Sequence, residues 1–195
     1  MFHGSRDMRV VAGDLRGRPI RAPDGPDTRP TSDRAREAVF NILLHAAWAP
    51  EMEGARLLDL FAGSGALGLE ALSRGAASCL FVERAEPALT AVRANIAAFK
   101  LEDRARVLKR DATALGERPA AEPPFDIAFL DPPYGKGLGE QALAALLSGG
   151  WLAEGAVVVF ERGSDEAPLS IAGFEVMDER RYGAAAMLIL ACRGR

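Results

Sequence analysis

The sequence predicts an α/β fold in which a mostly parallel, seven-stranded sheet carries helices on both faces and ends in an antiparallel hairpin. From Arg56 onward, short apolar runs alternate with stretches of helical periodicity, a pattern typical of parallel strands joined by helices. The apolar runs are nearly continuous, as expected for strands that are buried on both faces. The last two runs, 174–180 and 186–192, are joined through residues 181–183 with no helix between them, which predicts an antiparallel pair.

The elements of this main part follow from the same patterns. Five apolar runs predict the parallel strands, and the segments between them place apolar residues at helical spacing. The predicted strands are 56–61, 79–82, 105–108, 125–130 and 156–160, and the predicted helices are 66–74, 86–99 and 138–148.

The residues before this part predict a small N-terminal extension. Two β-like runs, 8–12 and 17–22, flank a loop that contains two glycines and indicate a hairpin. The segment 22–30 is rich in Pro, Gly and Asp, as linkers are. The Thr-Ser-Asp sequence at 31–33 offers capping oxygens to a helix that we expect to run to about Trp48.

Composition places the chain among globular proteins. Its 195 residues are 49% hydrophobic and 26% charged, and the chain is long enough to bury a sizeable core. No apolar run approaches the length of a membrane span, and the N-terminus lacks a signal-peptide core, so we expect a cytoplasmic protein. Two cysteines and two histidines are too few for a disulfide framework or a structural zinc site, and we expect no metal.

The net charge of −3 is unevenly distributed. Residues 1–36 hold eight arginines and five aspartates, a balance of +3, whereas the remainder holds 16 basic and 22 acidic residues, a balance of −6. A basic arm on an acidic body suggests that the arm meets a polyanion, although a solvated leader segment explains the same pattern. We therefore divide the chain into a basic arm and linker, 1–30, and a main domain, 31–195.

A glycine-rich loop follows the first strand of the main domain. Gly63, Gly65 and Gly68 satisfy the G-x-G-x-x-G pattern between a predicted strand and a predicted helix. Glu83 ends the next strand, 20 residues after Gly63, where a carboxylate accepts hydrogen bonds from ribose hydroxyls. The combination predicts a bound nucleoside.

Three carboxylates around this loop favour a cationic ligand over NAD. Asp59 precedes the loop, and Glu83 and Asp111 end the next two strand regions. A pyrophosphate would meet like charge there, whereas the sulfonium and ammonium groups of S-adenosylmethionine would be attracted. In this interpretation Asp59 holds the methionine end and Asp111 lies near the adenine amino group. Taken alone, Asp59 is also explained as a strand-end residue that caps the loop.

The fourth strand ends in Asp131-Pro132-Pro133-Tyr134, at the same edge of the sheet. The Asp131 carboxylate and the Pro132 carbonyl only accept hydrogen bonds, so together they can hold both hydrogens of an NH2 group. This would turn the nitrogen lone pair toward a methyl donor. Two prolines stiffen the backbone, and Tyr134 offers a flat face on which a base can stack. The tetrapeptide predicts methyl transfer to a planar amine by orientation of an in-line displacement.

With these motifs in view, the chain resembles the amino-methyltransferases, and within them the bacterial 16S rRNA guanine-N2 methyltransferases that modify a single guanine, position 966 in the usual numbering. The segments that carry the resemblance are RVVAGDLRGRPIRAP (9–23), RPTSDRAREAVFNIL (29–43), LLDLFAGSGALGLEALSRGA (57–76), DPPYGKGLG (131–139) and RRYG (180–183).

This resemblance implies a Rossmann-like S-adenosylmethionine methyltransferase fold with a cofactor half (31–115), a catalytic loop (131–139) and a closing hairpin (174–192). It implies a monomer that acts on 16S rRNA, within the small ribosomal subunit or an assembly intermediate. The implied catalytic residues are Asp131, Pro132, Pro133 and Tyr134. Those implied to line the cofactor pocket are Thr31, Asp59, Phe61, Ala62, Gly63, Ser64, Gly65, Glu83, Asp111 and Asp131. The expected RNA contacts are Arg16, Arg18, Arg29, Arg34, Arg36 and Lys136, of which Lys136 is equally explained as a solvated loop residue.

Other functions remain compatible with parts of the sequence. The same Asp-Pro-Pro-Tyr chemistry serves DNA adenine and protein glutamine methylation, although 195 residues leave little room for a DNA recognition domain. A nucleotide-binding oxidoreductase would explain the glycine loop alone, and a non-catalytic RNA-binding module would explain the basic arm alone.

Overall fold

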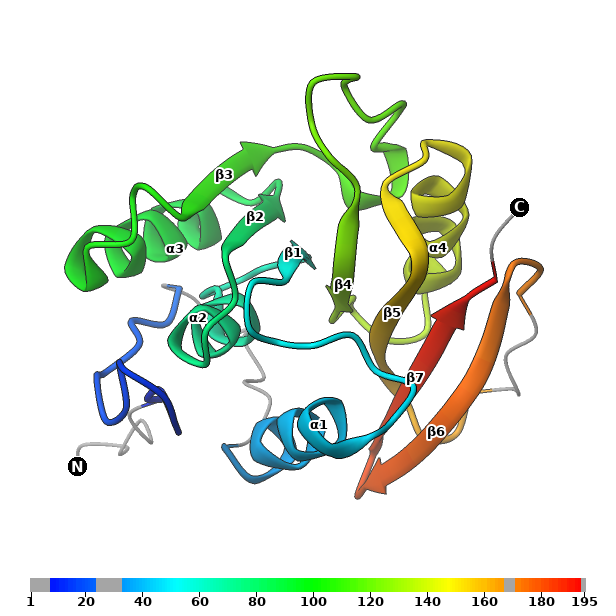
Figure 1. Cartoon of the computed structure of the whole chain (residues 1–195), viewed down its shortest axis with the longest axis horizontal. Coiled ribbons are helices and arrows are strands. Elements are labelled where there is room, and N and C mark those ends of the chain that lie inside the picture. The colour runs from blue at the N-terminus through cyan, green and yellow to red at the C-terminus, as the bar shows by residue number, and fades with distance from the viewer. Residues whose placement is uncertain (1–7, 24–32, 167–170, 194–195) are drawn as a thin grey trace.

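The computed structural model describes residues 8–23, 33–166 and 171–193, and its centre is one seven-stranded sheet of order β3-β2-β1-β4-β5-β7-β6 (Figure 1). This confirms the predicted α/β fold, which is Rossmann-like in its parallel part. The strands are β1 (Arg56–Leu60), β2 (Ser78–Glu83), β3 (Ala105–Lys109), β4 (Phe125–Leu130), β5 (Leu152–Gly163), β6 (Phe174–Tyr182) and β7 (Ala185–Cys192).

The pairing of the strands changes direction within the sheet. The strands from β3 through β5 are parallel, so their carboxyl ends lie at one edge. β7 pairs antiparallel with β5 on one side and with β6 on the other. The predicted closing hairpin is therefore present, and its second strand is inserted between β5 and β6.

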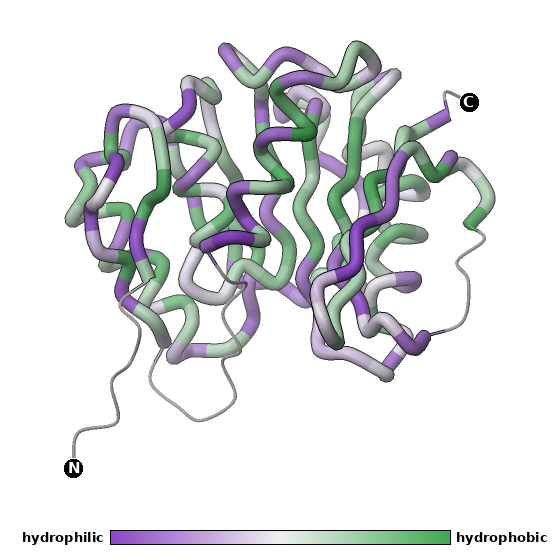
Figure 2. Tube along the Cα trace, turned by 90° about the horizontal axis from the view of Figure 1, so that it is seen from below, coloured by the Kyte–Doolittle hydropathy of each residue, from purple (hydrophilic) through white to green (hydrophobic). Residues whose placement is uncertain are grey.

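Helices cover both faces of the sheet, and apolar side chains fill the space between the helices and the strands. The described helices are α1 (Asp33–His45), α2 (Ala66–Ser73), α3 (Glu86–Phe99), α4 (Leu138–Ser148) and the short 3-10 helix η1 (Ala112–Ala114). Apolar residues of α1, α2, α3 and the N-terminal segment pack on one face, and those of α4 and η1 pack on the other. Figure 2 shows the hydrophobic residues concentrated along the central strands. Among the described residues, no helix is long and apolar enough to cross a membrane.

Two elements differ from the sequence prediction by three residues or more at an end. α1 ends at His45, three residues before the predicted end at Trp48, which is partly buried against the core. β5 extends to Leu152–Gly163, beyond the predicted 156–160, because β7 supplies hydrogen-bonding partners as far as Gly163. The predicted N-terminal hairpin is present as a short one: the antiparallel bridge between Arg9 and Pro19 is flanked by backbone hydrogen bonds from Val10 to Arg18 and from Ile20 to Met8.

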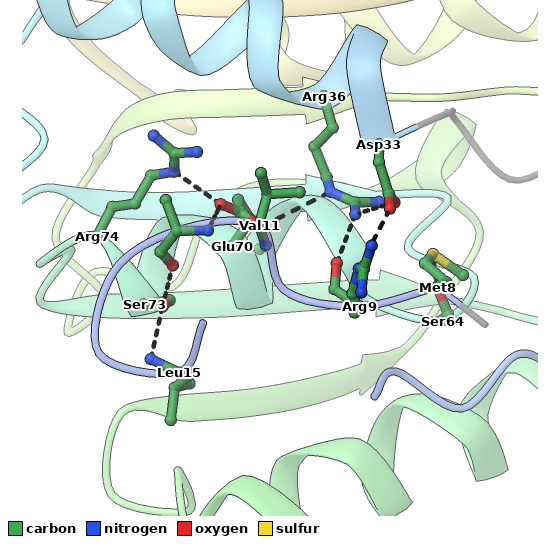
Figure 3. Close-up of polar contacts among 12 residues, drawn as sticks. Met8, Arg9, Val11, Leu15, Asp33, Arg36, Ser64, Glu70, Ser73 and Arg74 are labelled. Carbon is green, nitrogen blue, oxygen red and sulfur yellow. Dashed lines mark hydrogen bonds and ion pairs between the residues drawn. The ribbon is translucent and has the colours of Figure 1, made fainter. Parts of the chain in front are cut away.

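Side chains of the main domain hold the N-terminal segment 8–23 in place (Figure 3). The amides of Val11 and Ala12 donate to the buried carboxylate of Glu70 at 2.7 and 3.0 Å. Ser73 accepts a hydrogen bond from the amide of Leu15 and donates one to the carbonyl of Ala12. Pro19 lies opposite Arg9 in a non-hydrogen-bonded pair, so its missing amide hydrogen removes no bond from the hairpin. The segment thus packs on the helix that follows the glycine loop.

Candidate functional site

The predicted cofactor residues gather where the parallel strands end. Asp59 lies near the end of β1, and Glu83 is the last residue of the neighbouring β2. Asp131 follows β4, the other neighbour of β1, and its amide lies 3.5 Å from the carbonyl oxygen of Leu60. Asp111 follows β3, one strand further out.

The glycine loop owes its shape to backbone conformation and close packing. Gly65 has φ +80° and begins α2, and a side chain there would also press on Val92. Gly68 lies on the first turn of α2, where an added Cβ would come within 2.4 Å of the Phe81 ring. Only glycine therefore lets the helix approach β2 so closely. Phe61, which has a Cβ, also adopts a positive φ of 58°, a strained conformation that recurs at binding loops.

Asp59 is a buried carboxylate among other carboxylates. It is 3% exposed, and its Oδ2 accepts a hydrogen bond from the amide of Gly68 at 3.0 Å. Burial raises the pKa of Asp59 well above its ordinary value despite that hydrogen bond, and the charges of Asp131 and Glu83 raise it further. Asp59 thus ties β1 to the start of α2, as the capping interpretation requires, and its burial favours the protonated form until a cation lies beside it.

Glu83 connects the glycine loop to β2. Its Oε2 accepts a hydrogen bond from the amide of Gly63 at 3.0 Å, and its Oε1 accepts hydrogen bonds from the amides of Arg84 and Ala85. These contacts fix the carboxylate beside the loop, although a ribose hydroxyl would have to share or displace them. The carboxylate already belongs to the loop structure.

Asp111 lies in a different electrostatic environment. Hydrogen bonds from the hydroxyl and amide of Thr113, together with the Arg84 guanidinium, lower the pKa of Asp111. It therefore stays ionised at neutral pH at the outer side of the predicted adenine position.

These residues fit a cationic cofactor. Burial first, and then the like charges of Asp131 and Glu83, raise the pKa of Asp59, so a second negative charge there is unfavourable. A bound sulfonium and ammonium would relieve that repulsion, whereas a pyrophosphate would add to it. Among the described residues, no group of His, Cys, Asp and Glu side chains is arranged to hold a metal ion.

The Asp-Pro-Pro-Tyr segment forms a supported loop between β4 and α4. Pro132 is buried and Pro133 is exposed, while Asp131 and Tyr134 are half-buried. The hydroxyl of Tyr134 donates to Oε1 of Glu161 at 2.5 Å, and the amide of Gly135 donates to Oε1 of Glu166 at 3.0 Å. Both acceptors come from the end of β5 and the turn after it.

Comparison with known proteins agrees with this arrangement. The model of the family described as "Conserved hypothetical protein 95" matches residues 8–191. The chain belongs to this family. The small subunit rRNA methyltransferase D of Escherichia coli K12 is 41% identical over 81% of this chain and 76% of its own length. The enzyme of the same name from Haemophilus influenzae is 33% identical over 91% of this chain and 90% of its own length.

Solved structures show the fold of the family. The candidate methyltransferase yhhF of Escherichia coli superposes with a TM-score of 0.81 at 33% identity, covering 97% of this chain and 99% of its own. A Thermus thermophilus protein, TTHA0928, superposes with a TM-score of 0.70 at 32% identity, covering 93% of this chain and 98% of its own. The Rossmann-like fold with its terminal antiparallel hairpin is thus shared with a structure described as a methyltransferase.

The residues expected to contact RNA differ in their exposure and in their contacts. Arg16, Arg34 and Lys136 are exposed. Arg18 instead lies 4.6 Å from the centre of the Phe99 ring and donates to the carbonyl of Ala98, so part of its side chain packs on α3. Arg29 and Thr31 lie outside the described residues.

The expectation that Arg36 contacts RNA is wrong. Its side chain is fully buried, and it donates to Asp33 at 2.7 Å and to the carbonyl of Arg9 at 2.6 Å (Figure 3). Its Nε lies 3.7 Å from Oε2 of Glu70. The other oxygen of that carboxylate, Oε1, lies 2.8 Å from Nε of Arg74. Arg36 therefore joins α1 to α2 and to the N-terminal segment, and no phosphate reaches it.

Sequence reasoning missed three polar residues around the site. Glu70 and Asn95 are buried inside helices, where a single polar residue in an apolar pattern gives no sign of its partner. Glu161 had a usable signal, because it directly follows the apolar run 156–160. A carboxylate there lies at the same sheet edge as Asp131.

Proposed function

We propose that this protein transfers a methyl group from S-adenosylmethionine to the exocyclic N2 amine of one guanine in 16S rRNA. The observation that carries the proposal is the convergence of two groups at the ends of neighbouring strands. One is the carboxylate cluster of Asp59 and Glu83 around a glycine loop, and the other is the amine-binding sequence that begins at Asp131.

The cofactor would be held by the glycine loop and the carboxylates around it. When bound, S-adenosylmethionine supplies an electrophilic methyl group attached to a sulfonium. Asp59 and Asp131 contribute negative potential toward that positive charge, and Glu83 offers acceptors for the ribose hydroxyls. The backbone of residues 61–65 gives the ligand a close approach, because glycines leave room beside the chain.

The loop after β4 would orient the amine. The Asp131 carboxylate and the Pro132 carbonyl accept hydrogen bonds from the two N–H groups of the amine, so the nitrogen lone pair points toward the methyl carbon. The Tyr134 ring stacks on the base and sets its plane. A carbon–nitrogen bond forms as the carbon–sulfur bond breaks, and the amine then loses one proton to Asp131 or to water. The rate enhancement comes mainly from this orientation.

The substrate assignment rests on charge and on relatives. The matched enzymes from Escherichia coli and Haemophilus influenzae are named for the rRNA of the small subunit. Arg16 on the N-terminal segment, Arg34 on α1 and Lys136 beside Tyr134 are exposed cations that suit phosphate contacts. A stacked or paired guanine must leave its stack to reach the loop, and these contacts would hold the surrounding RNA.

The test is methyl transfer from labelled S-adenosylmethionine to small subunits that lack the modification, beside naked 16S rRNA and duplex DNA. Nucleoside analysis should recover the label as N2-methylguanosine at one site. Asp131→Ala should abolish transfer while leaving cofactor affinity nearly unchanged, and the exposed Asp103→Ala serves as its matched control. Label on DNA adenine or on protein would overturn the substrate, and binding of NAD in place of S-adenosylmethionine would overturn the cofactor.

A further inference from the structure

The end of β5 places a carboxylate beside the catalytic loop. Leu130 of β4 is paired with Phe160 of β5, so the residues that follow them, Asp131 and Glu161, lie at the same level of adjacent strands. Glu161 is 8% exposed and also faces Met187 of β7 in the register of the sheet. Its backbone is therefore held by pairing with β7, and the preceding Phe160 pairs with both β4 and β7.

The side chain of Glu161 contacts the loop through Tyr134. The Tyr134 hydroxyl donates to Oε1 of Glu161 at 2.5 Å, a hydrogen bond strengthened by the charge of the carboxylate. The hydroxyl oxygen lies on the axis through Cβ and Cγ about which the ring turns, so this bond fixes the direction of that axis, which the first torsion sets. The half-buried ring then has a defined position before any base arrives.

A second carboxylate holds the backbone of the same loop. Oε1 of Glu166 accepts hydrogen bonds from the amides of Gly135 and Gly163, and its Oε2 pairs with the buried Arg162. Gly135 has φ +71°, so the chain turns sharply immediately after Tyr134. The region 161–166 thus supports the loop at the ring and at the backbone.

We propose that Glu161 is a positioning residue that fixes the position of the Tyr134 ring for stacking on the target base. This role rests on the proposed methyl transfer, in which the loop orients a planar amine. Glu161 acts through Tyr134 and contacts neither cofactor nor methyl group. A ring that is free to swing about its first torsion would leave the base in several positions, and reactions of this kind depend steeply on geometry.

Kinetics on small subunits provide the first test. Glu161→Ala should lower kcat by about 10- to 100-fold while leaving the affinity for S-adenosylmethionine unchanged, because the cofactor residues lie on other strands. Glu161→Gln keeps an acceptor for the hydroxyl and should fall between Glu161→Ala and the wild type. Glu154→Gln, an exposed change at the opposite end of β5, is the matched control.

A double variant separates positioning from general support. If Glu161 acts through the hydroxyl, then Glu161→Ala combined with Tyr134→Phe should be no slower than the slower single variant. If the losses of kcat in the two single variants multiply in the double variant, the proposal is overturned. An unchanged kcat in Glu161→Ala, or a loss of cofactor affinity as large as the loss of kcat, would also overturn it.

The ring can also be observed without any reaction. The chain has two tyrosines, so a Tyr182→Phe background leaves Tyr134 as the only site for fluorotyrosine labelling. The fluorine spectrum should show one sharp resonance, which Glu161→Ala broadens or shifts and Glu161→Gln largely preserves. An unchanged spectrum in Glu161→Ala would overturn the positioning role. Failure of the wild type to methylate guanine, with the expected spectra, would instead overturn the proposed substrate.

Discussion

The side-chain amide of Asn95 donates one hydrogen bond to the carbonyl oxygen of Ser64, in the glycine loop, at 2.9 Å. The same side chain exchanges two hydrogen bonds with the backbone of Arg21, in the N-terminal segment. One buried residue of α3 therefore connects the segment that carries the basic residues to the loop proposed to hold the cofactor.

Removing the side-chain hydrogen bonds of Asn95 should affect both the N-terminal segment and the glycine loop. Asn95→Ala leaves the buried carbonyl of Ser64 and the amide of Arg21 without a partner, and we expect a loss of about 1–3 kcal/mol in the free energy of unfolding. Affinity for S-adenosylmethionine should fall as well, measured by calorimetry. Thr90→Ala, on an exposed face of the same helix, is the control and should change neither quantity. Stability lost with unchanged cofactor affinity would show that the glycine loop keeps its shape without Asn95.

Glu70 should contribute more to stability than a typical acidic residue. Its buried carboxylate accepts from two backbone amides and pairs with Arg36 and Arg74, so Glu70→Ala leaves buried positive charge without its partner. We expect a loss of about 3–5 kcal/mol, measured by urea unfolding. The exposed Glu37→Ala on α1 should change stability by less than about 0.5 kcal/mol. Similar losses in the two variants would contradict the buried network.

Asp59 should make the cofactor-free protein less stable as pH rises. Because burial raises the pKa of Asp59, the folded protein binds this proton more tightly than the unfolded chain does. Stability is therefore lost as pH increases from the ordinary aspartate pKa through the raised one. Asp59→Asn should remove that loss and raise Tm at about pH 7, while weakening the binding of S-adenosylmethionine. Thermal unfolding across pH measures the change in Tm, and calorimetry measures the binding of S-adenosylmethionine. A lower Tm for Asp59→Asn at about pH 7 would contradict the predicted contribution of Asp59.

Glu166 should have the opposite dependence on pH. Burial alone would raise the pKa of Glu166, but hydrogen bonds from Gly135 and Gly163 and the charge of Arg162 lower it overall. Its stabilising contribution is full above the ordinary glutamate pKa and is lost as pH falls through the lowered value. Hydrogen exchange at the Gly135 amide should therefore show less protection in acid. In Glu166→Gln, protection at neutral pH should already be reduced, and equal protection in both proteins would exclude this anchor.

The sequence predicts the elements of the main domain better than it predicts their polar partners. α3 and α4 have the predicted bounds, because their apolar spacing is regular and each begins after a clear break. The glycine loop and the Asp-Pro-Pro-Tyr loop lie where the strand pattern placed them. Each of these signals is local in the chain.

Partners that are distant in the sequence were not predictable in this way. Arg36 lies among other arginines in a basic segment, and nothing in the neighbouring sequence indicates that its side chain will be buried beside Glu70. The N-terminal run 8–12 has strand-like composition, yet two of its amides bond to a side chain 58 and 59 residues away. Tertiary contacts decided both outcomes.

The insertion of β7 between β5 and β6 has a consequence for synthesis of the protein. β5 carries Glu161, yet its second neighbour is a strand that follows β6 in the chain. The glycine loop and β1–β4 can therefore assemble while β5 still has an open edge. A chain interrupted before Ala185 would keep the carboxylates proposed to bind the cofactor, but β5 would expose unpaired backbone that invites association with other chains. Completion of the sheet beside Glu161 thus waits for β7, which emerges after β6 during translation.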